Sequence, residues 1–259
     1  MSSGIYAVIP AAGRGTRLGL EVPKLLAPID NETTVWSILR KKLLPNVDHI
    51  HLVVSPQWAT VFEKLLANDS EAYRLSCSVQ EEPRGMGDAI FGAYPHWAIA
   101  QTLLVVWGDQ IHISPSTLSR ALLQHRNHLG SHCTIPTVML ERPYVQYCFD
   151  GDDQLTEIRE TREGKVCDAT GYSDVGTFVL DVAGLRDAWE RYSQGRKAGA
   201  RTGEINFLPF LPYLAQNEWQ ITRVAVDDPI EARGINSPDD LKFFQQIYND
   251  GLKTQPASR

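Results

Sequence analysis

The chain has 259 residues, of which 43% are hydrophobic, and a formal net charge of −6 at neutral pH. A chain of this length buries enough apolar surface to fold without disulfides, and its acidic balance argues against a broad nucleic-acid-binding surface, which needs clustered Lys and Arg. No apolar run approaches the roughly 20 residues that span a bilayer, so we expect no membrane partner and a cytoplasmic protein.

In the first half of the chain, short apolar runs alternate with amphipathic stretches. This alternation predicts repeated strand, helix, strand units, which form a parallel sheet covered by helices on both faces. The expected strands are 6–9, 49–54, 75–79 and 103–107, and the expected helices are 35–44, 59–67 and 88–98. Ligands of such sheets bind beyond the carboxyl ends of the strands.

In the second half, after a helix at 116–128, the pattern predicts a mixed β region. The expected strands are 133–139, 145–149, 155–160, 176–180 and 220–226, and the expected helices are 182–192, 205–216 and 237–248. We therefore expect an α/β fold with a Rossmann-like mixed, mostly parallel sheet flanked by helices. A single domain should cover residues 1–250 in two halves, 1–130 and 131–250, with a mobile loop at 193–203 and a flexible tail at 251–259.

A glycine-rich, doubly basic loop follows the first strand. It reads Pro10-Ala11-Ala12-Gly13-Arg14-Gly15-Thr16-Arg17, and Pro23-Lys24 comes soon after. Small side chains let backbone N–H groups approach an anion, and nearby cations neutralise a triphosphate. The spacing fits neither the P-loop nor the dinucleotide fingerprint. We expect nucleotide binding, although the loop taken alone also fits an ordinary turn with solvated arginines.

Two oxygen-bearing side chains are candidates for holding a metal ion. Asp109 follows Gly108 directly after the strand at 103–107, and Asn236 lies far along the chain. Carboxylate and amide oxygens suit a hard divalent cation. The alternative interpretation of Asp109 is a turn cap, and Ser237-Pro238 after Asn236 is typical of a helix start.

Gln80 is a candidate for reading a nucleotide base. It follows the strand at 75–79, and Gly85 and Gly87 then leave backbone space beside a planar ring. A side-chain amide offers both a donor and an acceptor to a base edge. Glycine turns before helices are common, so this segment carries little weight by itself.

Together these motifs resemble the signature of the sugar-phosphate nucleotidylyltransferases, whose first segment reads A-A-G-x-G-T-R and whose lysine follows a proline. The similarity covers nearly the whole chain, continuing in order through Gln80 with Gly85, Gly108-Asp109, Glu160, Gly203-Glu204 and Gly234-Ile235-Asn236. The nearest pattern is the uridylyltransferase half of the bacterial N-acetylglucosamine-1-phosphate uridylyltransferases. No hexapeptide β-helix repeat is present, so we expect the acetyltransferase half of that family to be missing.

The resemblance implies a nucleotide-diphospho-sugar transferase (GT-A-like) fold, with a nucleotide-binding half at 1–130 and an acceptor-binding half at 131–250. It implies that a sugar 1-phosphate attacks the α-phosphorus of a nucleoside triphosphate, UTP favoured, releasing pyrophosphate. The implied catalytic groups are Arg17, Lys24 and Asp109, and Asp109 and Asn236 would hold Mg²⁺. The implied nucleotide contacts are Pro10, Ala11, Ala12, Gly13, Gly15, Thr16, Gln80, Gly85, Met86 and Gly108, and the acceptor contacts are Val145, Glu160, Asp174 and Glu204.

Several residues depart from the family pattern. Met86 stands where a threonine is usual, Val145 where a glycine is expected, and Asp174 where an asparagine often lies; Ile205 and Asn206 replace an aromatic pair. The phosphate and metal groups are kept, whereas the sugar pocket is altered.

The departures leave other functions open. One is nucleotidyl transfer to a non-sugar phosphate or phosphonate, as in cytidylyltransferases, and another is a non-catalytic nucleotide-sensing module. A glycosyltransferase is less favoured because Gly108-Asp109-Gln110 lacks the second carboxylate of an Asp-x-Asp motif. The sequence also leaves open the natural base and whether the chain forms a homo-oligomer.

Overall fold

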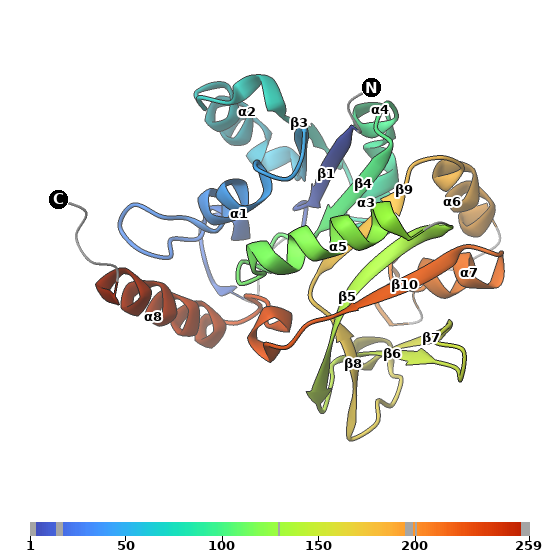
Figure 1. Ribbon diagram of the computed structural model, residues 1–259. Helices are drawn as coiled ribbons and strands as arrows, with labels where there is room; N and C mark the ends of the chain where they lie inside the picture. Colours follow the sequence, from blue (N-terminus) through green and yellow to red (C-terminus); the bar gives the residue numbers. More distant parts are fainter. Residues whose placement is uncertain (1–3, 14–17, 129, 195–198, 200, 255–259) are drawn as a thin grey trace.

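The structure is a computed structural model that describes residues 4–13, 18–128, 130–194, 199 and 201–254, the last four by their backbone alone. Within these residues ten strands form one mixed sheet in the order β3-β2-β1-β4-β9-β5-β8-β6-β7, with β10 beside β5 (Figure 1). The strands are β1 (Ile5–Pro10), β2 (His49–Val54), β3 (Leu75–Val79), β4 (Thr102–Val106), β5 (Ser131–Glu141), β6 (Val145–Phe149), β7 (Leu155–Glu160), β8 (Thr170–Asp174), β9 (Thr177–Asp181) and β10 (Gln220–Ala225).

Strands β3, β2, β1 and β4 are parallel, and β9 runs antiparallel beside β4. This confirms the predicted α/β class with a parallel core. The α-helices are α1 (Val35–Leu43), α2 (Ala59–Ala67), α3 (Met86–Gly92), α4 (Tyr94–Trp97), α5 (Pro115–Asn127), α6 (Leu185–Gln194), α7 (Phe210–Gln216) and α8 (Pro238–Thr254). The short 3₁₀ helices are η2 (Lys24–Leu26), η3 (Pro56–Trp58), η4 (Ala72–Arg74), η5 (Thr161–Glu163) and η6 (Pro229–Ala232).

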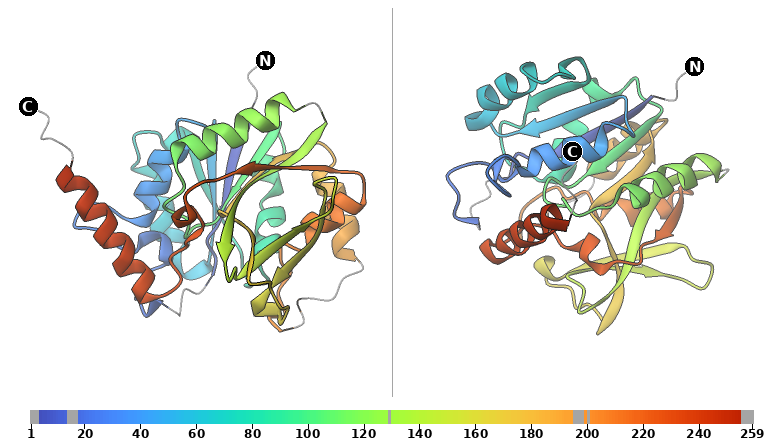
Figure 2. Two further views of the ribbon diagram at one scale, coloured as in Figure 1. Left: turned by 60° about the horizontal axis from the view of Figure 1, so that its bottom comes forward. Right: turned by 60° about the vertical axis from the view of Figure 1, so that its left-hand side comes forward.

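The two faces of the sheet carry separate apolar cores because successive strand residues point to opposite sides. In β4, Leu104 and Val106 pack with residues of α1, α2, α5 and α8. Leu103 and Val105 pack with residues of α3, α4, α6 and α7. All four side chains are fully buried. Figure 2 shows α8, in dark red, at the periphery of the molecule. Within the described residues, no helix combines the length and apolar character needed to cross a lipid bilayer.

Several elements differ from the sequence prediction for local reasons. The helix expected at 88–98 is two helices, α3 and α4, because Pro95 cannot continue the hydrogen bonding of a helix interior. Strand β8 was not predicted, since Gly171 and Ser173 interrupt any apolar run. Helix α7 begins at Phe210 and not at residue 205. Helix α8 continues to Thr254, and residues 255–259 lie outside the described residues.

Candidate functional site

Lys24, Asp109 and Asn236 come together beyond the carboxyl end of β4. Lys24 opens η2, Asp109 follows β4, and Asn236 precedes α8. The Lys24 Nζ atom lies 2.9 Å from Asp109 Oδ2 and 3.4 Å from Asn236 Oδ1. The side chains of Lys24 and Asp109 are only 25% and 19% exposed, so solvent screens their attraction incompletely. Three groups that lie far apart in the sequence therefore share one position in the fold.

Two glycines allow the close packing behind this cluster. The backbone N–H of Ile235 donates to the carbonyl of Asp109 at 3.0 Å, which attaches the segment before α8 to the end of β4. A Cβ atom on Gly234 would lie 3.1 Å from Asp109 Cγ, and one on Gly108 would lie 3.2 Å from Leu25 Cδ2. Larger residues at these positions would therefore move Asp109 or η2.

The helix cap at the start of α8 leaves the Asn236 side chain free to face Lys24. Ser237 Oγ accepts a hydrogen bond from Asp240 N–H, and Asp240 Oδ2 accepts from the backbone N–H groups of Asn236 and Ser237. This reciprocal arrangement is a capping box. Ser237 therefore forms the helix start that the sequence indicated, and the cap uses only the backbone of Asn236.

The donor chemistry of Asp109 and Asn236 fits a divalent cation. Their two oxygens face one cationic atom, Lys24 Nζ, and so converge on a position that already holds positive charge. Within the described residues, no group of three or more His, Cys, Asp or Glu is arranged to hold a metal ion by itself. A Mg²⁺ ion at this position would complete its coordination with phosphate oxygens and water, as Mg²⁺ commonly does.

A pocket of about 460 Å³ adjoins Ala12 and Gly13, the last residues of the glycine-rich loop that the structure describes before residue 18. Pro10 pairs with Val53 in the β1–β2 ladder, and Ala11 N–H donates to Val53 O at 2.7 Å, so the loop begins as a continuation of the sheet. The pocket is lined by Ala12, Gly13, Pro23, Trp58, Gln80 and Pro83. Its position beside both the loop and Gln80 matches what a nucleoside site requires. Gly15, Thr16 and Arg17 lie outside the described residues, so their assigned roles stay predictions.

The segment around Met86 is held against the second half of the chain. The N–H of Ile205 donates to Arg84 O at 2.6 Å, and Gly87 N–H donates to Ile205 O at 3.0 Å. Gly85 has φ +116°, and a Cβ there would lie 2.7 Å from Ile205 O. Only glycine satisfies both this conformation and this approach. The side chain of Met86 is partly buried and packs against the apolar core that includes residues of α6 and α7.

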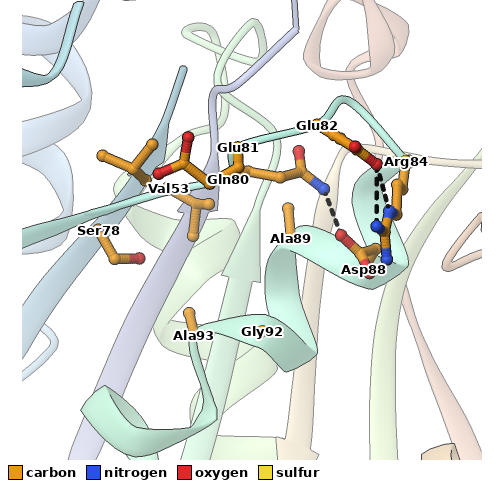
Figure 3. A pocket seen from close by; sticks show the side chains of 11 residues that line it. Val53, Ser78, Gln80, Glu81, Glu82, Arg84, Asp88, Ala89, Gly92 and Ala93 are labelled. Carbon is orange, nitrogen blue, oxygen red and sulfur yellow. Dashed lines mark hydrogen bonds and ion pairs between the residues drawn. The ribbon is translucent and has the colours of Figure 1, made fainter. Parts of the chain in front are cut away.

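A second pocket, of about 310 Å³, is also lined by Gln80 (Figure 3). Ser78, Arg84, Asp88 and Gly92 also line it. Gln80 therefore lines both pockets, and its amide nitrogen donates a hydrogen bond to Asp88 Oδ2 at 2.8 Å.

Two of the four predicted acceptor residues, Glu160 and Glu204, lie beside Arg162, and a third, Val145, lies next to Glu160 in the sheet. Val145 and Glu160 are paired in the β6–β7 register. Glu160 is 3% exposed and accepts a hydrogen bond from Arg162 Nε at 2.8 Å. Burial raises the pKa of Glu160, and the adjacent guanidinium opposes that shift. Arg162 Nη1 also lies 3.8 Å from Glu204 Oε2.

Asp174, the fourth acceptor residue, ends β8 and is buried. Its carboxylate accepts hydrogen bonds from Tyr147 Oη at 3.1 Å and from Gly176 N–H at 2.7 Å. Burial raises the pKa of Asp174 to about 6, and the negative charge of Asp109 acts in the same direction. Tyr147 comes from β6, the strand that begins at Val145. Asp174 therefore belongs to the same part of the sheet as Val145 and Glu160.

The sequence reasoning missed two polar residues of this region, Arg162 and Asn206. Arg162 Nη2 and Asn206 Oδ1 are buried and have no hydrogen-bond partner within the described part of the chain. Because buried polar atoms are nearly always paired, these two atoms are candidates for contacting a bound acceptor. The sequence carried one signal for Asn206, which stands where the family pattern has an aromatic residue. That difference was interpreted only as the loss of an aromatic contact, and not as the gain of a polar one.

Comparison with known proteins shows which family the chain is related to. Residues 7–199 match the MobA-like NTP transferase domain. The chain is 28% identical over 246 residues to the "Bifunctional protein GlmU" of Acidithiobacillus ferrooxidans, covering 93% of this chain and 51% of that protein. It is 28% identical over 245 residues to the protein of that name from Pseudomonas putida, and 29% identical over 250 residues to that from Desulfitobacterium hafniense, with the same coverage.

The chain thus spans about half the length of the curated relatives it matches. The domain match extends over most of the chain, from the first strand to the residues that follow α6. The chain therefore belongs to the MobA-like NTP transferase family, a family of nucleotidyltransferases.

Proposed function

We propose that this protein transfers a nucleoside monophosphate from a nucleoside triphosphate, UTP favoured, to a sugar 1-phosphate, forming an NDP-sugar and pyrophosphate. The observation that carries the proposal is the position of Lys24 Nζ, 2.9 Å from Asp109 and 3.4 Å from Asn236. These three groups occupy the positions that the family resemblance assigns to the reacting centre. The choice of a sugar phosphate and of UTP follows from the resemblance of the sequence motifs to the uridylyltransferase half of the N-acetylglucosamine-1-phosphate uridylyltransferases.

In the proposed reaction an oxygen of the acceptor phosphate attacks the α-phosphorus, and the bond between the α-phosphorus and the bridging oxygen to the β-phosphate breaks. The attacking oxygen is already anionic, so no protein base is needed, and pyrophosphate leaves with the electron pair. The protein's contribution is to position two polyanions and to neutralise the charge that develops. This agrees with a site that offers a lysine and metal-binding oxygens and no activated nucleophile.

Lys24 would bind phosphate oxygens at the reacting centre once its ammonium group leaves Asp109. Asp109 and Asn236 would hold Mg²⁺, and the ion would supply positive charge to the phosphate oxygens. The pocket beside Ala12, Gly13 and Gln80 would take the nucleoside. Trp58 also lines this pocket and offers an apolar aromatic surface to a base.

The acceptor would bind on the wall formed by β6, β7 and β8. Glu160 and Asp174 supply hydrogen-bond acceptors there, and Arg162 and Asn206 carry the buried unpaired atoms Nη2 and Oδ1. A hydroxyl group both donates and accepts, so a polyhydroxylated acceptor satisfies both kinds of unpaired atom. This pairing supports a sugar over an alkyl phosphate.

The proposal is tested by crossing four nucleoside triphosphates with a panel of acceptors in the presence of Mg²⁺ and measuring pyrophosphate. The panel includes hexose and N-acetylhexosamine 1-phosphates, a phosphorylated alcohol, a cyclitol phosphate and an aminoalkyl phosphonate. We expect the highest kcat/KM with UTP and a sugar 1-phosphate, and loss of turnover in Asp109→Ala. Preference for the phosphonate would indicate the cytidylyltransferase-like alternative, and nucleotide binding without turnover on any acceptor would indicate a sensing module.

A further inference from the structure

The side-chain amide of Gln80 is fixed in one orientation. Its Nε2 atom lies 2.8 Å from Asp88 Oδ2 and 3.2 Å from the carbonyl oxygen of Gly85. Both partners only accept hydrogen bonds, and a primary amide has two N–H groups. The reverse orientation would place Gln80 Oε1 against a carboxylate and a carbonyl. Figure 3 shows the amide nitrogen turned toward Asp88 and the amide oxygen turned away from it.

This allocation of hydrogen bonds changes what Gln80 offers to a ligand. The sequence suggested that the amide would present both a donor and an acceptor to a base. In the structure both N–H groups are engaged within the protein, so the remaining polar atom is the acceptor Oε1. Gln80 therefore offers a hydrogen-bond acceptor to a ligand bound beside it.

Asp88 is itself held in place by the backbone around it. It lies in the first turn of α3, whose start is fixed by the hydrogen bond from Gly87 N–H to Ile205 O. Gln80 is held by its own N–H, which donates to Val54 O at 2.9 Å. The cation Arg84 makes two hydrogen bonds to Glu82, at 3.0 and 2.9 Å, and its charge interacts with Asp88. Asp88 is thus a fixed acceptor directed at Gln80.

We propose that Asp88 is a positioning residue that keeps Gln80 as a hydrogen-bond acceptor and so makes the site select a base with a ring N–H group. Uracil carries such a donor at N3, whereas cytosine carries an acceptor at N3, which would repel Gln80 Oε1. The inference rests on the proposed function, because it requires that a bound nucleotide contacts Gln80. Removing the carboxylate leaves only the longer hydrogen bond to Gly85 O, so the amide becomes free to turn.

The test measures the dissociation constants of UTP and CTP by calorimetry on the whole protein, without an acceptor. The variants are Asp88→Ala, Asp88→Asn and Gln80→Ala. Wild type should prefer UTP, and in Asp88→Ala the preference should fall about tenfold, the value of one charge-assisted hydrogen bond. Asp88→Asn keeps an oxygen that accepts from Gln80, so it should keep most of the preference. N3-methyl-UTP should bind poorly to wild type and lose this penalty in Gln80→Ala.

Asp88→Asn also controls for stability, because both substitutions at position 88 remove an acidic group from the first turn of α3. An Asp88→Ala variant that keeps the wild-type preference, while Gln80→Ala loses it, would overturn the role of Asp88. A wild-type preference for CTP would overturn the recognition of a ring N–H. If no nucleoside triphosphate binds wild type, the proposed function fails together with this inference. If UTP binds with the stated selectivity but no acceptor reacts, only the transfer reaction is refuted.

Discussion

Replacing Lys24 by Met should strengthen metal binding and weaken catalysis at the same time. The Lys24 ammonium group occupies the position between Asp109 Oδ2 and Asn236 Oδ1 that the proposed divalent cation would take. The lysine and the metal would therefore compete for the same oxygens until a bound triphosphate drew the lysine away. Methionine keeps the length of the side chain and removes the charge.

The size of the effect follows from the exposure of the ion pair. Fully exposed pairs contribute at most about 1 kcal/mol, and this pair, at 2.9 Å and only 25% and 19% exposed, should contribute about 1–2 kcal/mol. Removing the competitor should therefore tighten the binding of a divalent cation by roughly 5- to 30-fold. Turnover should fall by about 100-fold or more, because the proposed reaction would lose a positive charge that stabilises its transition state.

Mn²⁺ serves as the probe, since its free concentration is measured directly by electron paramagnetic resonance in the absence of nucleotide, and Mg²⁺ is then added as a competitor. Turnover is measured as pyrophosphate release with UTP and the best acceptor. Lys41→Met is the matched control, because Lys41 is an exposed residue of α1 and loses the same charge. Equal or weaker Mn²⁺ binding in Lys24→Met than in this control would refute the competition, whatever happens to turnover.

Three further predictions concern stability. Gly87→Ala should destabilise the fold by about 2–3 kcal/mol, because the new Cβ would lie 2.2 Å from the Trp189 ring and 2.8 Å from Ile205 O; Gly92→Ala in the same helix, where a Cβ meets nothing within 4 Å, should be neutral or slightly stabilising in urea denaturation. Burial and the neighbouring histidines lower the pKa of His51 to about 3, so the unfolded chain binds more protons than the folded protein below pH 6.5, and stability falls as the pH drops. His51→Gln should remove about 2 kcal/mol of this loss at pH 5. An unchanged dependence of the unfolding free energy on pH would contradict the prediction. Asp174 has the opposite sign: its pKa is raised to about 6, the folded protein binds more protons between pH 4 and 6, and stability falls as the pH rises through that range, so Asp174→Asn should flatten this part of the profile.

The parallel core and the proximity of Lys24, Asp109 and Asn236 were predictable because each depends on short sequence motifs. Apolar runs of five or six residues predict β1, β2 and β4, and parallel strands necessarily place their carboxyl ends at one edge. That geometry predicts that Asp109 lies near the loop after β1. The family motif then adds Lys24 and Asn236, which are 212 positions apart and yet lie 3.4 Å apart in the structure.

The contact between the Met86 segment and Ile205 was not predictable in the same way. In the sequence, Gly85 and Gly87 resemble ordinary turn glycines. Both must be glycine because the backbone of Ile205, 118 to 120 residues further along the chain, lies where a Cβ would be. Residues 205–209 were expected to be helical, but Ile205 instead uses both its N–H and its carbonyl group in hydrogen bonds to Arg84 and Gly87. A segment whose backbone is committed to a distant partner cannot form the helix that its own apolar spacing favours.

The same distinction applies to recognition of the base. A sequence gives residue types, whereas specificity depends on which hydrogen bonds are already used within the fold. Gln80 as a residue type is neutral between bases, since an amide donates and accepts equally. In the fold, the hydrogen bonds from its Nε2 to Asp88 and Gly85 engage the donor groups and leave Oε1, an acceptor, for a ligand. Relatives that share this glutamine but lack an acceptor at the position of Asp88 are therefore free to orient the amide either way, so identity at Gln80 alone does not determine the nucleotide.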